Sequence, residues 1–341
     1  MVAYDIVLAL VCTTLIFLIL VLLFLLCKRR SIEPEDNIIT RPTIRAYTLT
    51  DIDAATDGFN QERILGKGRL GTVYGAVLGM GDVVAVKRVN PHLVLSNAGS
   101  SFSSTIRSLS SAHHPNIVPV IGFCEAPGER IIMMEFMGMH SLDHLLHQDQ
   151  HDGSASGTTP LLDWKNRVRI AAEAARGIEC LHEGTAPNIV HGSIKPCNIM
   201  IDLSFHARVS DYGLTFLAPQ QWRGLVGYLD AEYWIDKGGV CKASDVFGFG
   251  VVLLELLSGR RCEEGLIVKW GLPLIKDSRV LELLDPRLGV PSSGMGPLVR
   301  LAKVASACVS NSRKSRPSIV QVAAILNSLE MEMEMEMEIG P

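Results

Sequence analysis

The sequence predicts an α+β fold in which a strand-rich part precedes a helix-rich part, with one long apolar helix ahead of both. Three observations support this prediction. Residues 6–27 hold no charged side chain, residues 63–89 read as short β-branched runs broken by glycines, and long helical periods dominate beyond Leu161. With 341 residues, of which 48% are hydrophobic and 20% charged, the chain is long enough to bury a substantial core.

The apolar run 6–27 is predicted to be a transmembrane helix, because at about 1.5 Å per residue it spans a hydrocarbon core of about 30 Å. A secretory signal peptide is the alternative, but it would need a basic start and a shorter apolar core. Here residues 1–5 include an acid, and the basic run 28–30 follows the helix at once. Since basic residues stay on the cytoplasmic side, we expect a single-pass plasma-membrane protein with residues 1–5 outside and the remainder in the cytosol. The helix would be its contact with the lipid bilayer.

Residues 28–58 are predicted to be a juxtamembrane linker. Pro34, Pro42 and mixed charges leave the first half of this segment without a helical or strand period. A helical stretch, Thr50–Phe59, then opens at a Thr/Asp cap. The folded domain is therefore expected to begin at residue 59.

A glycine motif lies within three antiparallel strands that we expect over residues 63–89. The motif and the strands beside it supply a candidate cofactor-binding set: Gly66, Gly68, Gly71, Val73, Ala85 and Lys87. The glycines let backbone N–H groups close over phosphates, and the lysine of the V-A-V-K strand supplies the charge that holds the α and β phosphates. A dinucleotide-binding loop would instead need a helix directly after the glycines, where this sequence has a strand.

The helix-rich part begins with a predicted helix at Trp164–His182, after a Gly/Ser/Thr-rich stretch, 148–160, that we expect to be a surface loop. At the other end, residues 330–341 alternate Glu and Met with a period of two, which would be amphipathic only as a strand. No partner strand follows, so we expect a disordered acidic tail. The net charge of −4 includes the five glutamates of this tail, so the body is close to neutral and we expect no nucleic-acid partner.

Two further motifs follow in order. His191, Lys195 and Asn198 stand where the pattern H-R-D-x-K-x-x-N places them, and Asp211 opens a D-Y-G variant of D-F-G. Together with the glycine motif and V-A-V-K, this order resembles a eukaryotic protein kinase domain over residues 59–329. The resemblance implies a two-lobed protein kinase fold, with a β-rich N-lobe and an α-helical C-lobe, and it implies ATP and Mg²⁺ as ligands.

Three longer segments resemble plant receptor-like kinases: YTLTDIDAATDGFN, GLVGYLDAEYW and KASDVFGFGVVLLELLSGRR. Within that family we expect the crinkly-related branch. The family pattern implies that Met134 guards the nucleotide pocket, that Glu135 and Met137 lie in the hinge that binds adenine, and that Asn198 and Asp211 hold magnesium. It also implies other receptor-like kinases or co-receptors at the membrane as partners.

The catalytic loop departs from the family pattern. Ser193 stands where the catalytic aspartate is expected, and Gly192 replaces the arginine that would grip a phosphorylated activation segment, whereas Lys195 is retained. Between Gly213 and Glu232 the hydroxyl-bearing side chains are few, Thr215 and Tyr228. A missing general base costs about 10²- to 10⁴-fold in rate, so we expect impaired catalysis.

A third departure concerns the partner of Lys87. Thr105 stands where the family places the glutamate that pairs with this lysine. Lys87 would then lack its ion pair unless Glu62, Asp82 or Asp211 supplies one. A missing base combined with a mispositioned lysine should leave very little phosphoryl transfer.

These observations predict a membrane-anchored protein kinase fold that acts as an ATP-binding pseudokinase, a signalling scaffold or allosteric partner of active kinases. One alternative is a weakly active serine/threonine kinase. Another is a membrane adaptor that binds no nucleotide.

Overall fold

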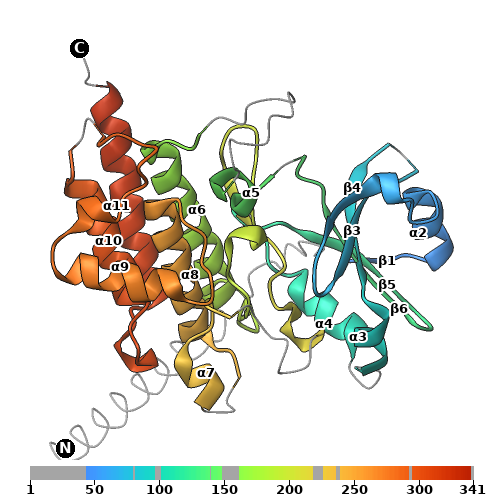
Figure 1. Ribbon diagram of the computed structural model, residues 1–341. Helices are drawn as coiled ribbons and strands as arrows, with labels where there is room; N and C mark the ends of the chain where they lie inside the picture. The colour runs from blue at the N-terminus through green and yellow to red at the C-terminus, as the bar shows by residue number, and fades with distance from the viewer. Residues whose placement is uncertain are drawn as a thin grey trace, which may run out of the picture. The chain divides into compact units, whose positions relative to one another are not determined.

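The computed structural model describes residues 44–79, 81–96, 101–138, 140–147, 161–217, 226–235, 239–291 and 294–338 (Figure 1). The predicted transmembrane helix at 6–27 and the predicted loop at 148–160 lie outside these residues. Within the described ranges, every helix is too short or too polar to cross a membrane. The described residues belong to one compact unit that starts at Ile44.

The strand-rich N-lobe is built on a six-stranded sheet with the order β1-β5-β6-β4-β3-β2 (Figure 1). Its strands are β1 (Arg45–Ala46), β2 (Ile64–Lys67), β3 (Gly71–Val77), β4 (Val83–Val89), β5 (Val120–Ala126) and β6 (Glu129–Glu135). β2, β3 and β4 pair antiparallel, as the sequence predicted for residues 63–89. The turn between β2 and β3 carries the glycine motif, so the motif lies at one edge of the sheet.

The chain joins the N-lobe earlier than the sequence predicted, at residue 44 rather than 59. β1 pairs in parallel with β5, and the helix α2 (Leu49–Thr56) packs against the sheet. A reciprocal capping box between Thr48 and Asp51 starts this helix, and Ile52 is fully buried beneath it. The second half of the expected linker is therefore part of the folded lobe, because it has both a hydrogen-bonding partner strand and an apolar residue to bury.

Two helices, α3 (Pro91–Ser96) and α4 (Phe102–Leu109), follow β4 and lie beside the sheet (Figure 1). Phe102 and Ile106 on α4 are buried, and the Phe102 ring meets the Phe123 ring of β5 edge-on, 6.3 Å between centroids. Apolar residues four apart on α4 therefore fix which face of this helix meets the N-lobe.

The C-lobe consists of helices and one small sheet. The helices are α5 (Leu142–His147), α6 (Trp164–Glu183), α7 (Ala231–Ile235), α8 (Lys242–Ser258), α9 (Leu266–Lys276), α10 (Gly296–Cys308) and α11 (Ile319–Glu338). The strands are β7 (His140–Ser141), β8 (Ile199–Ile201) and β9 (Ala207–Val209), in that order across the sheet. Single 3-10 turns occur at Gln61–Arg63, Pro196–Asn198, Leu214–Leu217, Val280–Glu282 and Arg313–Ser315.

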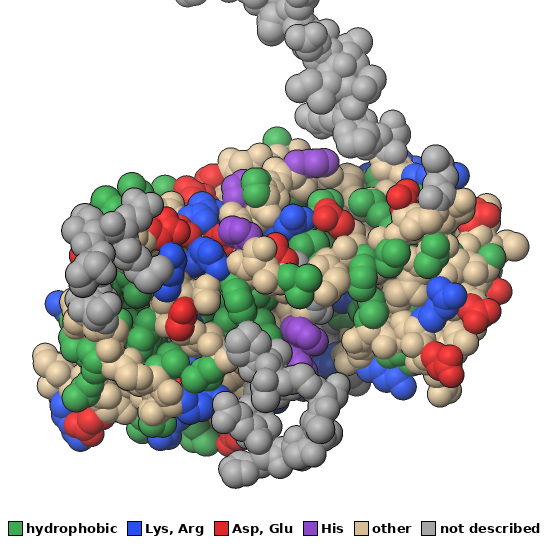
Figure 2. Space-filling model, turned by 90° about the horizontal axis from the view of Figure 1, so that it is seen from above, with side chains coloured by type: hydrophobic (Ala, Val, Ile, Leu, Met, Phe, Trp, Pro, Cys, Tyr) green, Lys and Arg blue, Asp and Glu red, His purple; other side chains and the backbone are tan. Residues whose placement is uncertain are grey.

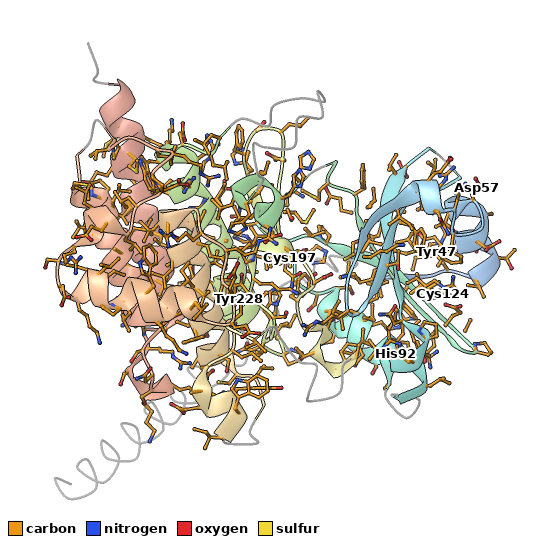
Figure 3. The ribbon with its side chains drawn as sticks, in the orientation of Figure 1. Tyr47, Asp57, His92, Cys124, Cys197 and Tyr228 are labelled. Atoms are coloured by element: carbon orange, nitrogen blue, oxygen red, sulfur yellow. The ribbon has the colours of Figure 1, made fainter. Side chains whose placement is uncertain are left out.

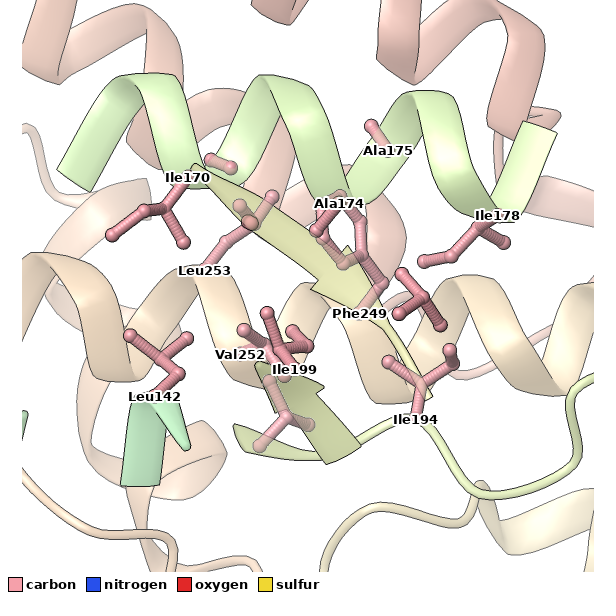
Figure 4. Packing of buried hydrophobic residues seen from close by; sticks show 14 of the residues in the cluster. Leu142, Ile170, Ala174, Ala175, Ile178, Ile194, Ile199, Phe249, Val252 and Leu253 are labelled. Carbon is pink, nitrogen blue, oxygen red and sulfur yellow. The ribbon is translucent and has the colours of Figure 1, made fainter. Parts of the chain in front are cut away.

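The core of the C-lobe lies where α6 and α8 face each other. Ala174 and Ile178 of α6 point toward Phe249 and Leu253 of α8 (Figure 4), and all four are fully buried. Small residues let α8 approach its other neighbour, since a Cβ at Gly250 would lie 2.6 Å from the Cβ of Cys308 on α10. α8 is thus packed on two sides, which gives the residues at its start a fixed position next to the loops of the site.

The prediction of a disordered tail from residue 330 is wrong as far as Glu338, because α11 continues through the Glu-Met repeat. Glu330 pairs with Arg176 of α6 at 2.6 Å, Glu332 pairs with Arg300 of α10, and Met333 is buried. Glutamate and methionine are both strong helix formers, so the repeat extends a helix that already has packing partners on two sides. Residues 339–341 lie outside the described part of the chain.

Candidate functional site

A cleft of about 830 Å³ lies between the two lobes, a volume typical of small-molecule sites. The structure brings all the sequence-predicted site residues to its lining: Gly66, Gly68, Gly71, Val73, Ala85, Lys87, Met134, Glu135, Met137, Ser193, Lys195, Asn198 and Asp211. They come from β2, β3, β4, β6 and the loops around β8 and β9. Residues more than a hundred positions apart in the chain therefore share one cleft.

The three glycines of the motif serve different purposes. A Cβ at Gly71 would lie 2.0 Å from the carbonyl oxygen of Arg88, so this glycine is required by the close pairing of β3 with β4. A Cβ at Gly66 would meet nothing within 4 Å, and one at Gly68 would only reach the Gly71 carbonyl at 3.9 Å. The turn thus presents bare backbone to the cleft, which is the arrangement that lets amide groups approach phosphates.

Lys87 of β4 has its ion pair, and its partner is Asp211, directly after β9. The Lys87 residue is 6% exposed. Burial by itself raises the pKa of the Asp211 carboxyl, but the charge and hydrogen bond of Lys87 outweigh it and hold that pKa below its ordinary value. Of the three carboxylates that the sequence left open, Asp211 is therefore the one in place.

Thr105 plays no part in this pair. Its hydroxyl donates to the backbone carbonyl of Ser101, 3.0 Å away in the first turn of α4. A threonine side chain is neutral and satisfied within its own helix, so α4 contributes no charge to Lys87 from this position.

The loop that carries Ser193 is fixed from α8. The carboxylate of Asp245 accepts the backbone N–H groups of His191 at 2.8 Å and Gly192 at 2.7 Å, and lies 2.8 Å from the ring of His182. Gly192 has a φ of +79°, a conformation that favours glycine. A Cβ at this position would also come within 2.3 Å of the Thr215 methyl group, so the space beside Gly192 is already filled.

Ser193 and Asn198 lie at the floor of the cleft. The side-chain amide of Asn198 donates to the Ser193 carbonyl at 2.9 Å, and the Asn198 carbonyl accepts the backbone N–H of Ser210 at 2.8 Å. These bonds join the loop to the strand that leads to Asp211. The sequence pattern expects a general base at residue 193, and a serine hydroxyl has a pKa far too high to take a proton near neutral pH.

Sequence reasoning missed several residues of the cleft. His140 and His144 line its rim with rings stacked 4.5 Å apart, and histidines gather along the middle of the molecule in Figure 2. Cys197 also lines the cleft and lies between the two lobes in Figure 3. Only Cys197 had a signal that could have found it, its place inside the catalytic-loop motif. His140 belongs to β7 and His144 to α5, and neither is part of a recognisable sequence motif.

A set of contacts that the sequence did not show fixes the end of the activation segment. Asp230, which is fully buried, pairs with Arg313 at 3.0 Å and with Arg316 at 3.3 Å. Glu232 accepts the backbone N–H of Arg313 at 2.8 Å. These contacts join positions more than eighty residues apart, which spacing along the chain does not reveal.

Comparison with known proteins gives a consistent result. Residues 59–326 match the family described as protein tyrosine and serine/threonine kinase. The chain is 34% identical to Receptor-like protein kinase BRI1-like 3 of Arabidopsis thaliana, over 84% of this chain and 25% of that protein. It is 35% identical to Proline-rich receptor-like protein kinase PERK10 of Arabidopsis thaliana, over 83% of this chain and 38% of that protein. The chain thus spans well under half the length of these two relatives.

Two further matches cover more of the partner protein. The Arabidopsis thaliana Serine/threonine-protein kinase PBS1 is 35% identical over 89% of this chain and 68% of its own length. A solved structure of the pseudokinase domain of BIR2, described as an immune regulator of the RLK/Pelle family, is similar with a TM-score of 0.68. That match has 32% identity and covers 84% of this chain and 86% of the BIR2 chain.

Proposed function

Because this chain belongs to the protein tyrosine and serine/threonine kinase family, and within it to the plant receptor-like kinases, we propose that it is a nucleotide-binding pseudokinase. It would act in signalling as a scaffold or allosteric partner of active kinases. The observation that carries the proposal is Ser193 at the base position of a cleft that keeps all the other predicted binding residues. The likeness to the pseudokinase domain of BIR2 supports it.

The binding side of the proposal rests on the lining of the cleft. The bare backbone around Gly66 and Gly68 would close over phosphates, and Lys87 and Lys195 would face them with positive charge. Met134 and the hinge at Glu135 and Met137 would hold an adenine between apolar side chains and backbone groups.

The catalytic side of the proposal rests on what the same residues cannot do. A general base contributes about 10²- to 10⁴-fold, roughly 3–5 kcal/mol of barrier, and the Ser193 hydroxyl does not supply it. Lys87 is held by Asp211 with no contribution from Thr105. A base would act on the attacking hydroxyl and Lys87 on the α and β phosphates, so changes at both positions bear on the same transfer step and their effects combine.

The experiment is a phosphoryl-transfer assay on the full chain in detergent, with radiolabelled ATP and a generic protein substrate. Wild-type transfer should equal the background of a Lys87→Met control. Ser193→Asp and Thr105→Glu should each recover little, whereas the double variant should recover more than the two singles combined, because the residues act as a unit. Robust wild-type turnover that disappears with Lys87→Met would instead establish the weakly active serine/threonine kinase.

We also propose that the protein is anchored in the plasma membrane by residues 6–27, with its kinase fold in the cytosol and other receptor-like kinases as partners. The uncharged run and the basic residues after it support the anchor. Relatives that are themselves named receptor-like kinases support the choice of membrane and partner.

A further inference from the structure

We propose that Asn90 is a positioning residue for the glycine turn, and that it raises the affinity of the cleft for the phosphate groups of a nucleotide. The inference rests on the proposed nucleotide binding and assigns a residue that belongs to none of the sequence motifs. Three observations carry it. Asn90 binds two consecutive carbonyl groups of the turn, the turn is closed on itself, and its tip residue Leu70 packs against the core.

The pairing of β3 with β4 brings Asn90 to the glycine turn. Gly71, the first residue of β3, pairs with Val89, the last residue of β4. The antiparallel register then places Leu70 opposite Asn90. The backbone N–H of Asn90 donates to the Leu70 carbonyl at 2.9 Å, so the pairing continues one step beyond the strands and into the turn.

The side chain of Asn90 adds a second bond to the same turn. Its amide nitrogen donates to the Arg69 carbonyl at 2.6 Å. A trans peptide unit points its carbonyl and its N–H in opposite directions, so this bond turns the N–H of Leu70 away from Asn90. Arg69 and Leu70 line the cleft, whereas Asn90 is not among the described residues that line it. Asn90 therefore holds the turn from outside the ligand space and favours the orientation that offers an amide group to a phosphate.

The turn itself is closed between Gly68 and Gly71. The Gly68 N–H donates to the Gly71 carbonyl at 2.9 Å, and the Gly71 N–H donates to the Gly68 carbonyl at 3.3 Å. At the tip, the Leu70 side chain is partly buried and packs against the main apolar core. The turn is thus a small closed unit, and Asn90 ties it to β4, the strand that carries Lys87.

A turn that is held in this way lowers the cost of binding phosphates. A free glycine loop loses conformational entropy when it closes over a ligand, and glycine loses more than any other residue. Bonds that already exist without ligand remove part of this cost, and the gain appears as affinity. The tip of the turn would meet the phosphates, whereas the hinge would hold the adenine. The gain should therefore depend on the phosphate groups.

The test compares ATP with adenosine, which has the same base and sugar but no phosphate. Asn90→Ala removes the side-chain bond and keeps the backbone bond. With the full chain in detergent and Mg²⁺, the dissociation constant of ATP should rise by about two- to tenfold, the effect of one hydrogen bond, and that of adenosine should not change. Unchanged ATP affinity would overturn the inference. An equal loss for both ligands would also overturn it, because Asn90 would then support the whole lobe.

Asn60→Ala is the matched control. The Asn60 side chain also bonds to the N-lobe backbone, accepting the Glu62 N–H at 3.0 Å, and its amide donates to Asp57 and not to the turn. This variant should bind ATP as the wild type does. A similar loss of ATP affinity in Asn60→Ala would contradict the inference. Failure of the wild type to bind ATP would overturn the proposed nucleotide binding itself, so the two failures are distinguishable.

Amide hydrogen exchange gives a readout that needs no ligand. In the free protein, Asn90→Ala should speed exchange in peptides that cover residues 66–71, because the turn opens more often, whereas Asn60→Ala should leave these peptides unchanged. Equal exchange over residues 66–71 in Asn90→Ala and the wild type would contradict the inference. Thermal unfolding without nucleotide checks that each variant is folded. Should Asn90→Ala fail this check, Asn90→Leu replaces it, since leucine keeps the size of the side chain and has no donor.

Discussion

Gly192 combines two constraints at one residue. Its φ of +79° places it where only glycine is relaxed, and Asp245 holds that conformation by accepting the backbone N–H groups of His191 and of Gly192 itself. The methyl group of Thr215 occupies the space where a Cβ would point. Gly128 has a similar φ of +76° but nothing within 4 Å of its Cβ position, so it separates the backbone effect from the packing effect.

This difference predicts the stability of two alanine variants. Gly128→Ala should lower the free energy of unfolding by about 1 kcal/mol, the cost of a left-handed non-glycine residue. Gly192→Ala should lower it by about 2–3 kcal/mol, because overpacking adds to that cost. The measurement is urea unfolding followed by tryptophan fluorescence.

A Thr215→Ser background identifies the source of the extra loss. Serine lacks the methyl group that meets the Cβ, so Gly192→Ala should cost less in this background than in the wild type. If Gly192→Ala were no more costly than Gly128→Ala, the packing argument would be wrong.

At the same scale, the sequence located the residues of the cleft but not all their partners. Motif spacing placed Lys87, Ser193 and Asp211 because each belongs to a short local pattern. It left the ion-pair partner of Lys87 open among three carboxylates, since contacts across 124 positions depend on how the lobes fold. For the same reason His140 and His144 went unnoticed.

At the scale of single elements, α8 carries a buried carboxylate, Glu255, that should make the free energy of unfolding depend on pH. Glu255 is fully buried and accepts the Tyr228 hydroxyl at 2.6 Å, while the ring of His147 lies 3.9 Å away. Burial raises the pKa of Glu255 to about 7 from 4.5, against the opposing effect of these contacts. The folded protein therefore binds a proton here that the unfolded chain releases.

The sign of the effect follows from linkage. A raised carboxyl pKa stabilises the fold fully below pH 4.5 and loses that contribution as the pH rises through about 7. Between pH 5 and 8 the loss should amount to about 3 kcal/mol. Glu255→Gln keeps an oxygen for the Tyr228 hydroxyl but cannot ionise, so its unfolding free energy should vary less over this range.

The check is the melting temperature of both proteins from pH 5 to 8. As the pH increases, the melting temperature of Glu255→Gln should rise relative to that of the wild type, and the variant should be the more stable protein at pH 8. Parallel curves for the two proteins would rule out Glu255 as the titrating group.

Helices and strands were predictable where one periodicity dominated. The strands from Ile64 to Val89 and the helix α6 appear as predicted, because their apolar residues recur at strand and helical spacing. The prediction for the Glu-Met repeat was wrong because it considered the period of two and not the helix propensity of glutamate and methionine. The sequence also could not show that Arg176 and Arg300 lie on neighbouring helices, where they pair with glutamates of the repeat.

For the molecule as a whole, the fold class followed from the order of motifs along the chain. Glycine turn, lysine strand, catalytic loop and D-Y-G segment appear in one sequence order that the two-lobed kinase fold requires, and the comparisons bear the family out. The start of the domain did not follow, because β1 pairs with β5 across more than seventy residues. Parallel pairing at such a separation leaves no local pattern to read.

The predicted anchor has a direct test on intact cells. A fluorescent tag at Pro341 should be accessible from the cytosol and should leave the membrane fraction only with detergent, since residues 28–30 direct the chain after the helix inward. Replacing the three basic residues with serine should weaken this orientation. A soluble product trimmed at its N-terminus would show that residues 6–27 are a cleaved signal peptide.

The tyrosine hydroxyl of the activation segment is engaged inside the protein. The Tyr228 hydroxyl is bound to Glu255 inside the C-lobe, and Thr215 packs its methyl group against Gly192. Asp245 meanwhile fixes the catalytic loop from a buried helix. The catalytic loop is therefore set when the chain folds, and a modifying enzyme finds the Tyr228 hydroxyl already bound inside the C-lobe. We expect the signalling activity of this protein to depend on how many copies the cell makes and on the nucleotide concentration.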